Sequence, residues 1–377
     1  MNEADFHNVA AQVVRQKDWI VIADTLRVAH HHSEKLQALG ARRVFAIAAF
    51  RGAALVPADL PYPAVCLDIQ SDSPINSIRA SISAFRALPA HVLTRLDEWD
   101  PDKAALVFSP IWGEDAPLHG RSVFGARWQQ WQRLENKMIC DAMWDSIGIQ
   151  RAPSLIVPVY QVALESAHQN LNVGMGTVWV GDNKEGWHGG AEYLRWIRSP
   201  ADFRGALPFF RSHCDQVRIQ PFLDGIPCSI HGMVYPDHVV TFRPCEMLVF
   251  RQRGSTRLRY GGAATTWDPE LHQRKGMRAM ARRVGVHLRS QHGYRGMFTI
   301  DGIMTAEGFR PTELNPRYGA AAVRLLRGLP NLPLYILHKA LCEGIDLNYD
   351  PQALEALVVD AADRYRTISA GFDVPGK

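Results

Sequence analysis

Short apolar runs alternate with helical stretches in the first third of this 377-residue chain. Apolar runs cover residues 19–23 and 43–48, and a helical pattern over 26–39 separates them. Shorter runs at 64–69 and 104–108 continue the series. Strands that alternate with helices favour a parallel sheet with helices on its faces, so we expect an α/β domain built on a βαβ unit.

The turn after the first apolar run lacks the glycines of a dinucleotide-binding loop. After Ile22 the chain reads Ala-Asp-Thr-Leu-Arg-Val, where a dinucleotide site has Gly-x-Gly-x-x-Gly. We therefore expect a Rossmann-like domain over residues 1–115 that holds substrate instead of a dinucleotide.

A second helical pattern begins beside a lysine. Apolar residues between 138 and 147 recur at helical spacing, with Asn136 as the predicted N-cap and Gly148 just past the end. Lys137 then lies in the first turn, where a cation opposes the helix dipole unless an anion also binds there.

The middle of the chain reads as short strands separated by glycine. We predict strands over 177–180, 217–223 and 229–235, and a helix over 191–203. The glycine-rich loop 184–190 is suited to folding over phosphates, and the commoner alternative is a turn without a ligand.

Composition and charge exclude several classes of protein. With 47% hydrophobic and 21% charged residues the chain is neither disordered nor collagen-like, and a formal net charge of +4 gives no argument for nucleic acid. Its six cysteines are scattered, so neither a zinc site nor a disulfide framework is indicated. The acidic amino terminus and the lack of a long apolar run favour a cytoplasmic protein without membrane contact.

The most informative segment is a predicted hairpin that carries two acids. If its turn centres near residue 307, Asp301 and Glu313 are cross-strand neighbours, a pair that needs a proton or a cation. Asn315 and Arg317 share the face of Glu313 because side chains alternate along a strand. A solvated hairpin edge is the alternative, but the added amide and guanidinium favour a site for Mg²⁺ and polyphosphate.

These motifs resemble the ATP-grasp superfamily over about residues 130–320. Its ligases and carboxylases end their catalytic lobe with an acid and then a Glu-x-Asn-x-Arg strand. The resemblance implies that Asp301, Glu313 and Asn315 bind two Mg²⁺ ions, with Mn²⁺ as a substitute. It implies that Arg317 steadies an acyl phosphate or carboxyphosphate.

The same resemblance implies the position of ATP. Lys137 matches the first nucleotide lysine of the superfamily. Gln220, Phe222 and Leu223 resemble its hinge, where backbone groups meet the adenine edge, with Gln220 in place of the commoner glutamate.

The expected second lysine is missing from the strand before the glycine-rich loop. Lys184, with Gly189 and Gly190 after it, is the nearest candidate for a phosphate contact. A solvated lysine on a loop is the equal alternative.

Four arginines follow in the predicted catalytic lobe: Arg251, Arg253, Arg257 and Arg259. Their alternation predicts one basic face on a strand. In similar proteins this region lies near the γ-phosphate and the acyl acceptor, which makes Arg259 a candidate catalytic residue. A solvated face is the alternative.

The resemblance implies a fold and a reaction. We expect the Rossmann-like domain to precede a two-lobed ATP-grasp domain with antiparallel sheets. Its parts are linker helices and a lid over 116–221, a catalytic lobe over 222–345 and a helical tail over 346–377. The implied reaction is the ATP-dependent joining of a small-molecule carboxylate to an amine, amino acid or peptide-like, through an acyl phosphate. A kinase, a carboxylase-like enzyme and a non-catalytic nucleotide-binding protein are the alternatives, and the oligomeric state stays open, with a homodimer among the options.

Overall fold

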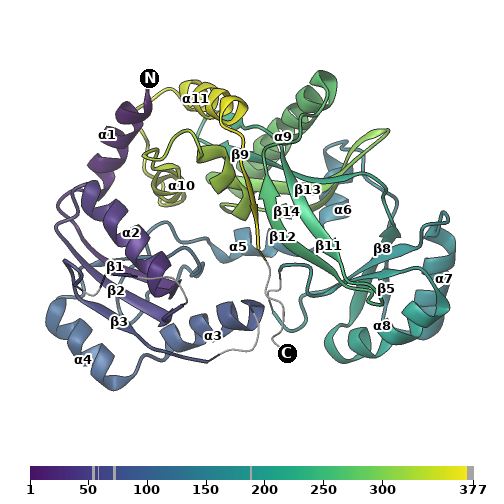
Figure 1. Cartoon of the computed structure of the whole chain (residues 1–377), viewed down its shortest axis with the longest axis horizontal. Coiled ribbons are helices and arrows are strands. Elements are labelled where there is room, and N and C mark those ends of the chain that lie inside the picture. Colours follow the sequence, from purple (N-terminus) through teal and green to yellow (C-terminus); the bar gives the residue numbers. More distant parts are fainter. Residues whose placement is uncertain (53–55, 58, 71–73, 187–188, 372–377) are drawn as a thin grey trace. The chain divides into compact units, whose positions relative to one another are not determined.

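The computed structural model of the chain describes residues 1–377 except 53–55, 58, 71–73, 187–188 and 372–377 (Figure 1). The chain divides into two units. The first comprises Met1–Gln129 and Asn331–Tyr349, and the second comprises Gln130–Pro330 and Asp350–Lys377. The predicted boundaries do not include this return of residues 331–349 to the first unit.

The first unit contains a four-stranded parallel sheet in the order β3-β2-β1-β4. The strands are β1 (Asp18–Thr25), β2 (Arg43–Phe50), β3 (Ala64–Cys66) and β4 (Leu106–Phe108). The helices are α1 (Glu3–Val14), α2 (Leu26–Ala38), α3 (Pro74–Arg86), α4 (Ala90–Trp99) and α10 (Leu334–Cys342). The predicted βαβ unit is therefore confirmed.

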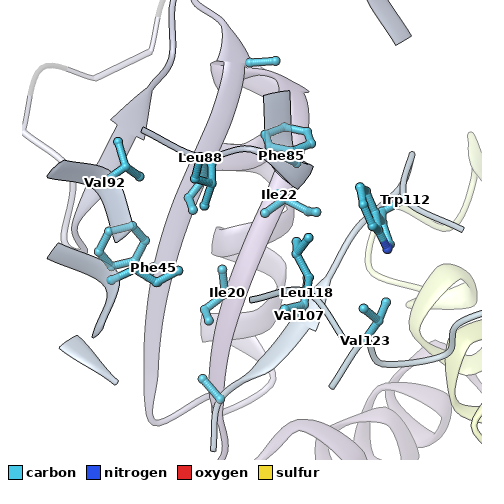
Figure 2. Close-up of a cluster of buried hydrophobic side chains, with 14 residues drawn as sticks. Ile20, Ile22, Phe45, Phe85, Leu88, Val92, Val107, Trp112, Leu118 and Val123 are labelled. Carbon is cyan, nitrogen blue, oxygen red and sulfur yellow. The ribbon is translucent and has the colours of Figure 1, made fainter. Parts of the chain in front are cut away.

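The apolar runs of the first unit form its core because helices cover the sheet. Figure 2 shows Ile20, Ile22 and Phe45 from the central strands packed with Phe85 and Leu88. Burial on both faces explains why these strands read as continuous apolar runs instead of alternating ones.

The second unit holds two antiparallel sheets. The larger has the order β14-β13-β9-β11-β12-β15 with β10 beside β9, and the smaller has the order β5-β8-β6-β7. The larger comprises β9 (Ile226–Val234), β10 (Val239–Thr241), β11 (Cys245–Arg251), β12 (Leu258–Ala264), β13 (Gly296–Thr305), β14 (Gly308–Asn315) and β15 (Ile368–Ala370). The smaller comprises β5 (Leu155–Pro158), β6 (Thr177–Gly181), β7 (Leu194–Ile197) and β8 (Gln216–Pro221).

Helices pack against both sheets of this unit. They are α5 (Gln129–Gln132), η1 (Arg133–Glu135), α6 (Cys140–Ser146), α7 (Gln161–Leu171), α8 (Pro200–His213), α9 (Leu271–His292), η2 (Ala320–Leu326) and α11 (Pro351–Arg364). Helix α9 packs on β9, β10 and β14. An ideal Cβ on Gly285 of α9 would lie 3.1 Å from Phe298 of β13, so the Phe298 face of the sheet is the apolar one. None of the described helices is long and apolar enough to cross a membrane.

The predicted helix over 191–203 is wrong. Residues Leu194–Ile197 form β7, which pairs with β6, and α8 begins only at Pro200. Ser199 caps α8 by accepting a hydrogen bond from the Asp202 N–H at 3.2 Å, and a proline at the first helical position reinforces this start.

The predicted helix after Asn136 begins later than expected. The Asn136 side chain accepts from the Met138 N–H at 3.0 Å and so closes a local turn, with Lys137 inside it. Helix α6 starts at Cys140. Gly148 has φ +63°, the left-handed conformation expected just past a helix end.

Candidate active site

One face of the larger sheet of the second unit carries a band of polar side chains, here called the polar face. Its members occupy two neighbouring cross-strand rows: Ser229, Asp301 and Glu313, and then His231, Thr299 and Asn315. Directly opposed residues share a face, and so do residues two apart in one strand. The face opposite α9 is therefore the polar one.

A β-bulge places Asp301 opposite Glu313. Counting from the turn, the strands pair regularly as far as Gly302 opposite Pro311, and the next pair is Asp301 opposite Glu313. Thr312 is thus an extra residue on β14. Without it Asp301 would face Thr312, and Glu313 would point to the other side of the sheet. The predicted facing pair is confirmed, and it depends on a bulge that the alternation of residues does not reveal.

A buried ion pair holds the bulge. Arg218 of β8 donates from Nη1 to the Thr312 carbonyl at 3.2 Å, and from Nε and Nη2 to both oxygens of Asp141 at 2.8 and 2.6 Å. Ser154 Oγ donates to Asp141 as well, at 2.5 Å. Arg218 is 1% exposed, so these charged bonds form out of water and fix the bulge against β8 and α6.

The two carboxylates have different surroundings. Asp301 accepts from Ser229 Oγ at 2.5 Å and from Asn315 Nδ2 at 2.9 Å. Burial, and then the charge of Glu313, raise the pKa of Asp301 to about 6. Lys137 Nζ lies 3.2 Å from Glu313 Oε1. The structure therefore brings Lys137, the predicted nucleotide lysine, beside the carboxylate pair.

Arg317 is held by two partners. Its Nη2 donates to Asn315 Oδ1 at 3.0 Å, and its Nε donates to Glu135 Oε2 at 3.3 Å. Glu135 is 4% exposed, which makes it a buried acid that orients the guanidinium. Sequence reasoning assigned Glu135 no role, although it stands two residues before Lys137 in the same segment.

Asp301, Glu313 and Asn315 fit a hard divalent cation. They offer carboxylate and amide oxygens, the ligands that Mg²⁺ prefers, and a cation would relieve the repulsion in the carboxylate pair. No three His, Cys, Asp or Glu side chains gather as a metal cluster anywhere in the described part of the chain. The candidate ligand set is therefore two carboxylates and one amide oxygen.

An aromatic cluster lies on the smaller sheet. Trp196 of β7 stacks on Phe222 with ring centroids 4.2 Å apart, and Val178 and Leu258 pack beside them. Gln220 of β8 is directly opposite Val178 and so shares its face. Gln220 is 6% exposed, and its Oε1 has no hydrogen-bond partner among the described residues. Leu223 follows Phe222 directly after β8. The structure thus brings the three predicted hinge residues to one end of this sheet.

The structure does not bring Lys184 to these groups. Its Nζ forms an exposed ion pair with Asp215 at 2.8 Å. Lys184 follows the end of β6 where Gly181 is opposite Val217, whereas Gln220 lies toward the other end of β8. Gly189 and Gly190 precede β7 in the same connection, and residues 187–188 of the predicted phosphate loop lie outside the described residues.

The prediction of one basic face for the four arginines is wrong. Arg251 pairs with Leu258, and Arg259 pairs with Phe250, so Arg251 and Arg259 point to opposite faces. Arg251 lies over the Trp196 ring at 5.1 Å, while Arg253 is in the turn between the strands. Arg259 points away from the Leu258 side, and the structure does not bring it to the carboxylate pair. Its buried Nε has no hydrogen-bond partner in the described part of the chain.

Comparison with known proteins identifies the fold. No family model matches the sequence, and no curated protein matches it. Among solved structures, biotin carboxylase from Campylobacter jejuni superposes with a TM-score of 0.62 at 12% identity, over 90% of this chain and 73% of that one. The chain has the ATP-grasp fold. The predicted fold class is therefore confirmed.

Two further structures share this fold. Carboxyaminoimidazole ribonucleotide synthase from Aspergillus clavatus has a TM-score of 0.58 at 11% identity, over 89% of this chain and 78% of that one. L-amino acid ligase from Bacillus licheniformis has a TM-score of 0.54 at 12% identity, over 87% and 75%. The ATP-grasp fold thus holds enzymes of more than one reaction, and likeness at this identity establishes the fold alone.

The raised pKa of Asp301 predicts a pH dependence of stability in the protein freed of divalent cations. The unfolded carboxyl titrates near pH 4, about two units lower, so between pH 4 and 6 only the native state holds the proton. Stability should fall as pH rises through this window, by about 1–3 kcal/mol. Urea unfolding in EDTA at pH 4.5 and 7 should show this loss in the wild type and a smaller loss in Asp301→Asn. Equal losses in both proteins would contradict it.

The buried ion pair of Arg218 with Asp141, which holds the bulge, predicts that two arginine substitutions lower the stability of the protein by different amounts. Arg218→Lys removes the bidentate bond to Asp141 and the bond to Thr312, and we expect a loss of about 3–5 kcal/mol in the free energy of unfolding. Arg151→Lys is the control, because Arg151 pairs with the exposed Asp145 and lies 3.8 Å from Asp141. It should cost less than about 1 kcal/mol. If urea unfolding showed the same loss of stability in both variants, Arg218 would not be what holds the bulge.

Proposed function

We propose that this chain is an ATP-dependent carboxylate–amine ligase. It transfers the γ-phosphoryl group of ATP to a carboxylate, and an amine then attacks the acyl phosphate, so that an amide, ADP and phosphate are released. The observation that carries this proposal is the facing pair of Asp301 and Glu313, with Lys137 and Arg317 within hydrogen-bonding reach of its ligand set, on an ATP-grasp fold.

Asp301, Glu313 and Asn315 are the residues that would hold Mg²⁺. Bound there, Mg²⁺ neutralises phosphate charge during phosphoryl transfer. Because the carboxylates come from adjacent strands of one sheet, their spacing is set by the backbone ladder and the bulge, not by a mobile loop.

Positioning and charge supply most of the catalysis. Lys137 contributes a cation beside Glu313 that is suited to the non-transferred phosphate oxygens. Arg317 stabilises the acyl phosphate and the tetrahedral species that follows it. Glu135 and Asn315 already fix its guanidinium, so the guanidinium has to move little when negative charge develops on these species.

Gln220 and the aromatic cluster support an adenine site. Trp196 and Phe222 offer an apolar wall, and the unpaired Gln220 Oε1 is a hydrogen-bond acceptor for an amino group. The Phe222 N–H already donates to the Gly176 carbonyl at 3.0 Å. Leu223 is therefore the hinge residue whose backbone we assign to the adenine edge.

The loop after β6 favours a ligase over a biotin-dependent carboxylase. The resemblance to carboxylases implies a strongly glycine-rich lid, whereas residues 182–193 contain three glycines. The Bacillus licheniformis structure shows that the same fold occurs in an L-amino acid ligase. Small acids and amines, amino acids first, are therefore the substrates to test.

This proposal predicts that two substrates together stimulate ADP release. Purified protein with Mg²⁺ and ATP would be given pairs of L-amino acids, and products read by mass spectrometry. We expect ADP, phosphate and a condensed mass from the productive pairs, with the rate at least about 100-fold lower in Glu313→Gln. ADP release with one substrate alone and a stable phosphorylated product would instead establish a kinase.

The unpaired Gln220 oxygen predicts that a substitution at this position weakens ATP binding without lowering the stability of the free protein. Gln220→Leu removes an unsatisfied buried acceptor, so the free protein should be at least as stable as the wild type. The KM for ATP should rise about tenfold with kcat little changed, because uniform binding is lost. Gln216→Leu, on the exposed start of the same strand, is the control and should change neither. An unchanged KM in Gln220→Leu would remove this residue from the adenine site.

A further inference from the structure

The chain that leaves β14 runs over the polar face. At Gly319 it lies so close that an ideal Cβ would be 2.3 Å from Thr299 Oγ1 and 3.1 Å from His231 Cε1. It then continues as η2, which packs on β11 and β12. Residues 319–326 therefore cross the sheet on the same side as the carboxylate pair.

Two arginines of the segment from Arg317 to Leu326 differ in their partners. Arg317, at its start, is bound by Glu135 and Asn315. Arg324, within η2, is partly buried and has no hydrogen-bond or ion-pair partner in the part of the chain that the structure describes. A guanidinium with five donors and no anion beside it is suited to binding an anionic group.

Arg324 belongs to η2, which packs on β12 and β11, the strands that carry Tyr260 and Cys245. Burial raises the pKa of both to about 12, and the nearby charge of Arg324 opposes that rise in each case. Asp301 contributes to the raised pKa of Tyr260, so this phenol is also within reach of the charge of the carboxylate pair. Cys245 is directly opposite Ser229, and Tyr260 is opposite Val249, four residues further along β11, so both side chains point to the polar face.

The sheet register sets the separation of these groups. Cys245 is directly opposite Ser229, Ser229 is opposite Asp301, and Asp301 is opposite Glu313. Because η2 packs on β11 and Lys137 pairs with Glu313, η2 with Arg324 lies at the β11 end of this four-residue row and Lys137 lies at the β14 end. From Cys245 to Asp301 there are two strand spacings, about 10 Å. A group bound by Arg324 is thus distinct from the phosphates that Lys137 serves.

We propose that Arg324 and Tyr260 bind a non-reacting carboxylate of the amine substrate. This inference rests on the proposed function and names its acceptor as an amino acid, or a peptide with a free carboxylate, instead of a simple amine. The guanidinium and the phenol O–H both donate, which suits a carboxylate. A span of about 10 Å from the metal ligands leaves room for the acyl phosphate and an amine held beside it.

The test compares free amino acids with their amides. ADP release would be measured with L-amino acids as the acid and with glycine or glycinamide, and L-alanine or L-alaninamide, as the amine. For Arg324→Gln we expect kcat/KM for the free amino acid to fall about 10- to 100-fold, with little change for its amide and an unchanged KM for ATP. Tyr260→Phe should show a smaller loss of the same kind.

Arg327→Gln is the matched control, because Arg327 is exposed and follows η2 by one residue. It should leave every constant unchanged, and the thermal midpoints of all three variants would show that they fold. If kcat/KM of Arg324→Gln fell equally with the amino acid and its amide, the proposal would be overturned. A raised KM for ATP in this variant would also overturn it, because Arg324 would then lie at the triphosphate. If no acid–amine pair releases ADP in the wild type, the proposed function fails and this inference fails with it.

Discussion

The site depends on two carboxylates that face each other on a largely buried sheet. Asp301 and Glu313 repel one another, and burial raises the pKa of Asp301, so the folded chain holds a pair that favours a proton or a cation. One extra residue, Thr312, brings them to the same side. A regular ladder would place them on opposite faces of the sheet, and the proposed metal site could not form.

The positive charges around this pair are arranged by role. Arg218 has a structural role, because it donates hydrogen bonds to Asp141 and to the Thr312 carbonyl and so stabilises the bulge. Lys137 lies beside Glu313, and Arg317 is fixed by Glu135. Arg324 alone among these four has no anionic partner in the described chain, which is why it is the residue that we assign to substrate.

The sequence predicts the facing pair correctly through two deviations that cancel. A turn centred on residue 307 implies the pairing of Asp301 with Glu313, but the strands meet at Thr305 and Gly308, half a residue earlier, and the bulge restores the register. Alternation along a strand reveals which residues share a face, so it finds the Glu-x-Asn-x-Arg set. It does not reveal a bulge that a distant arginine stabilises.

Other features depend on contacts between segments far apart in the chain. Glu135 gains its role from Arg317, 182 residues later. Residues 194–197 form a strand because they pair with β6, although their local pattern favours a helix. The return of α10 to the first unit rests on contacts such as Lys339 Nζ with the Gly125 carbonyl at 3.0 Å. The local sequence pattern around each residue does not reveal such long-range pairings.

Binding of Mn²⁺ in the presence of ADP tests the central claim most directly. Loss of the free Mn²⁺ signal in electron paramagnetic resonance would give the affinity, with Asp301→Asn and Glu313→Gln as variants and Glu307→Gln, an exposed acid of the same hairpin, as the control. The account predicts that each of the first two lowers the affinity at least about tenfold and that the control does not. Unchanged affinity in both site variants would contradict it.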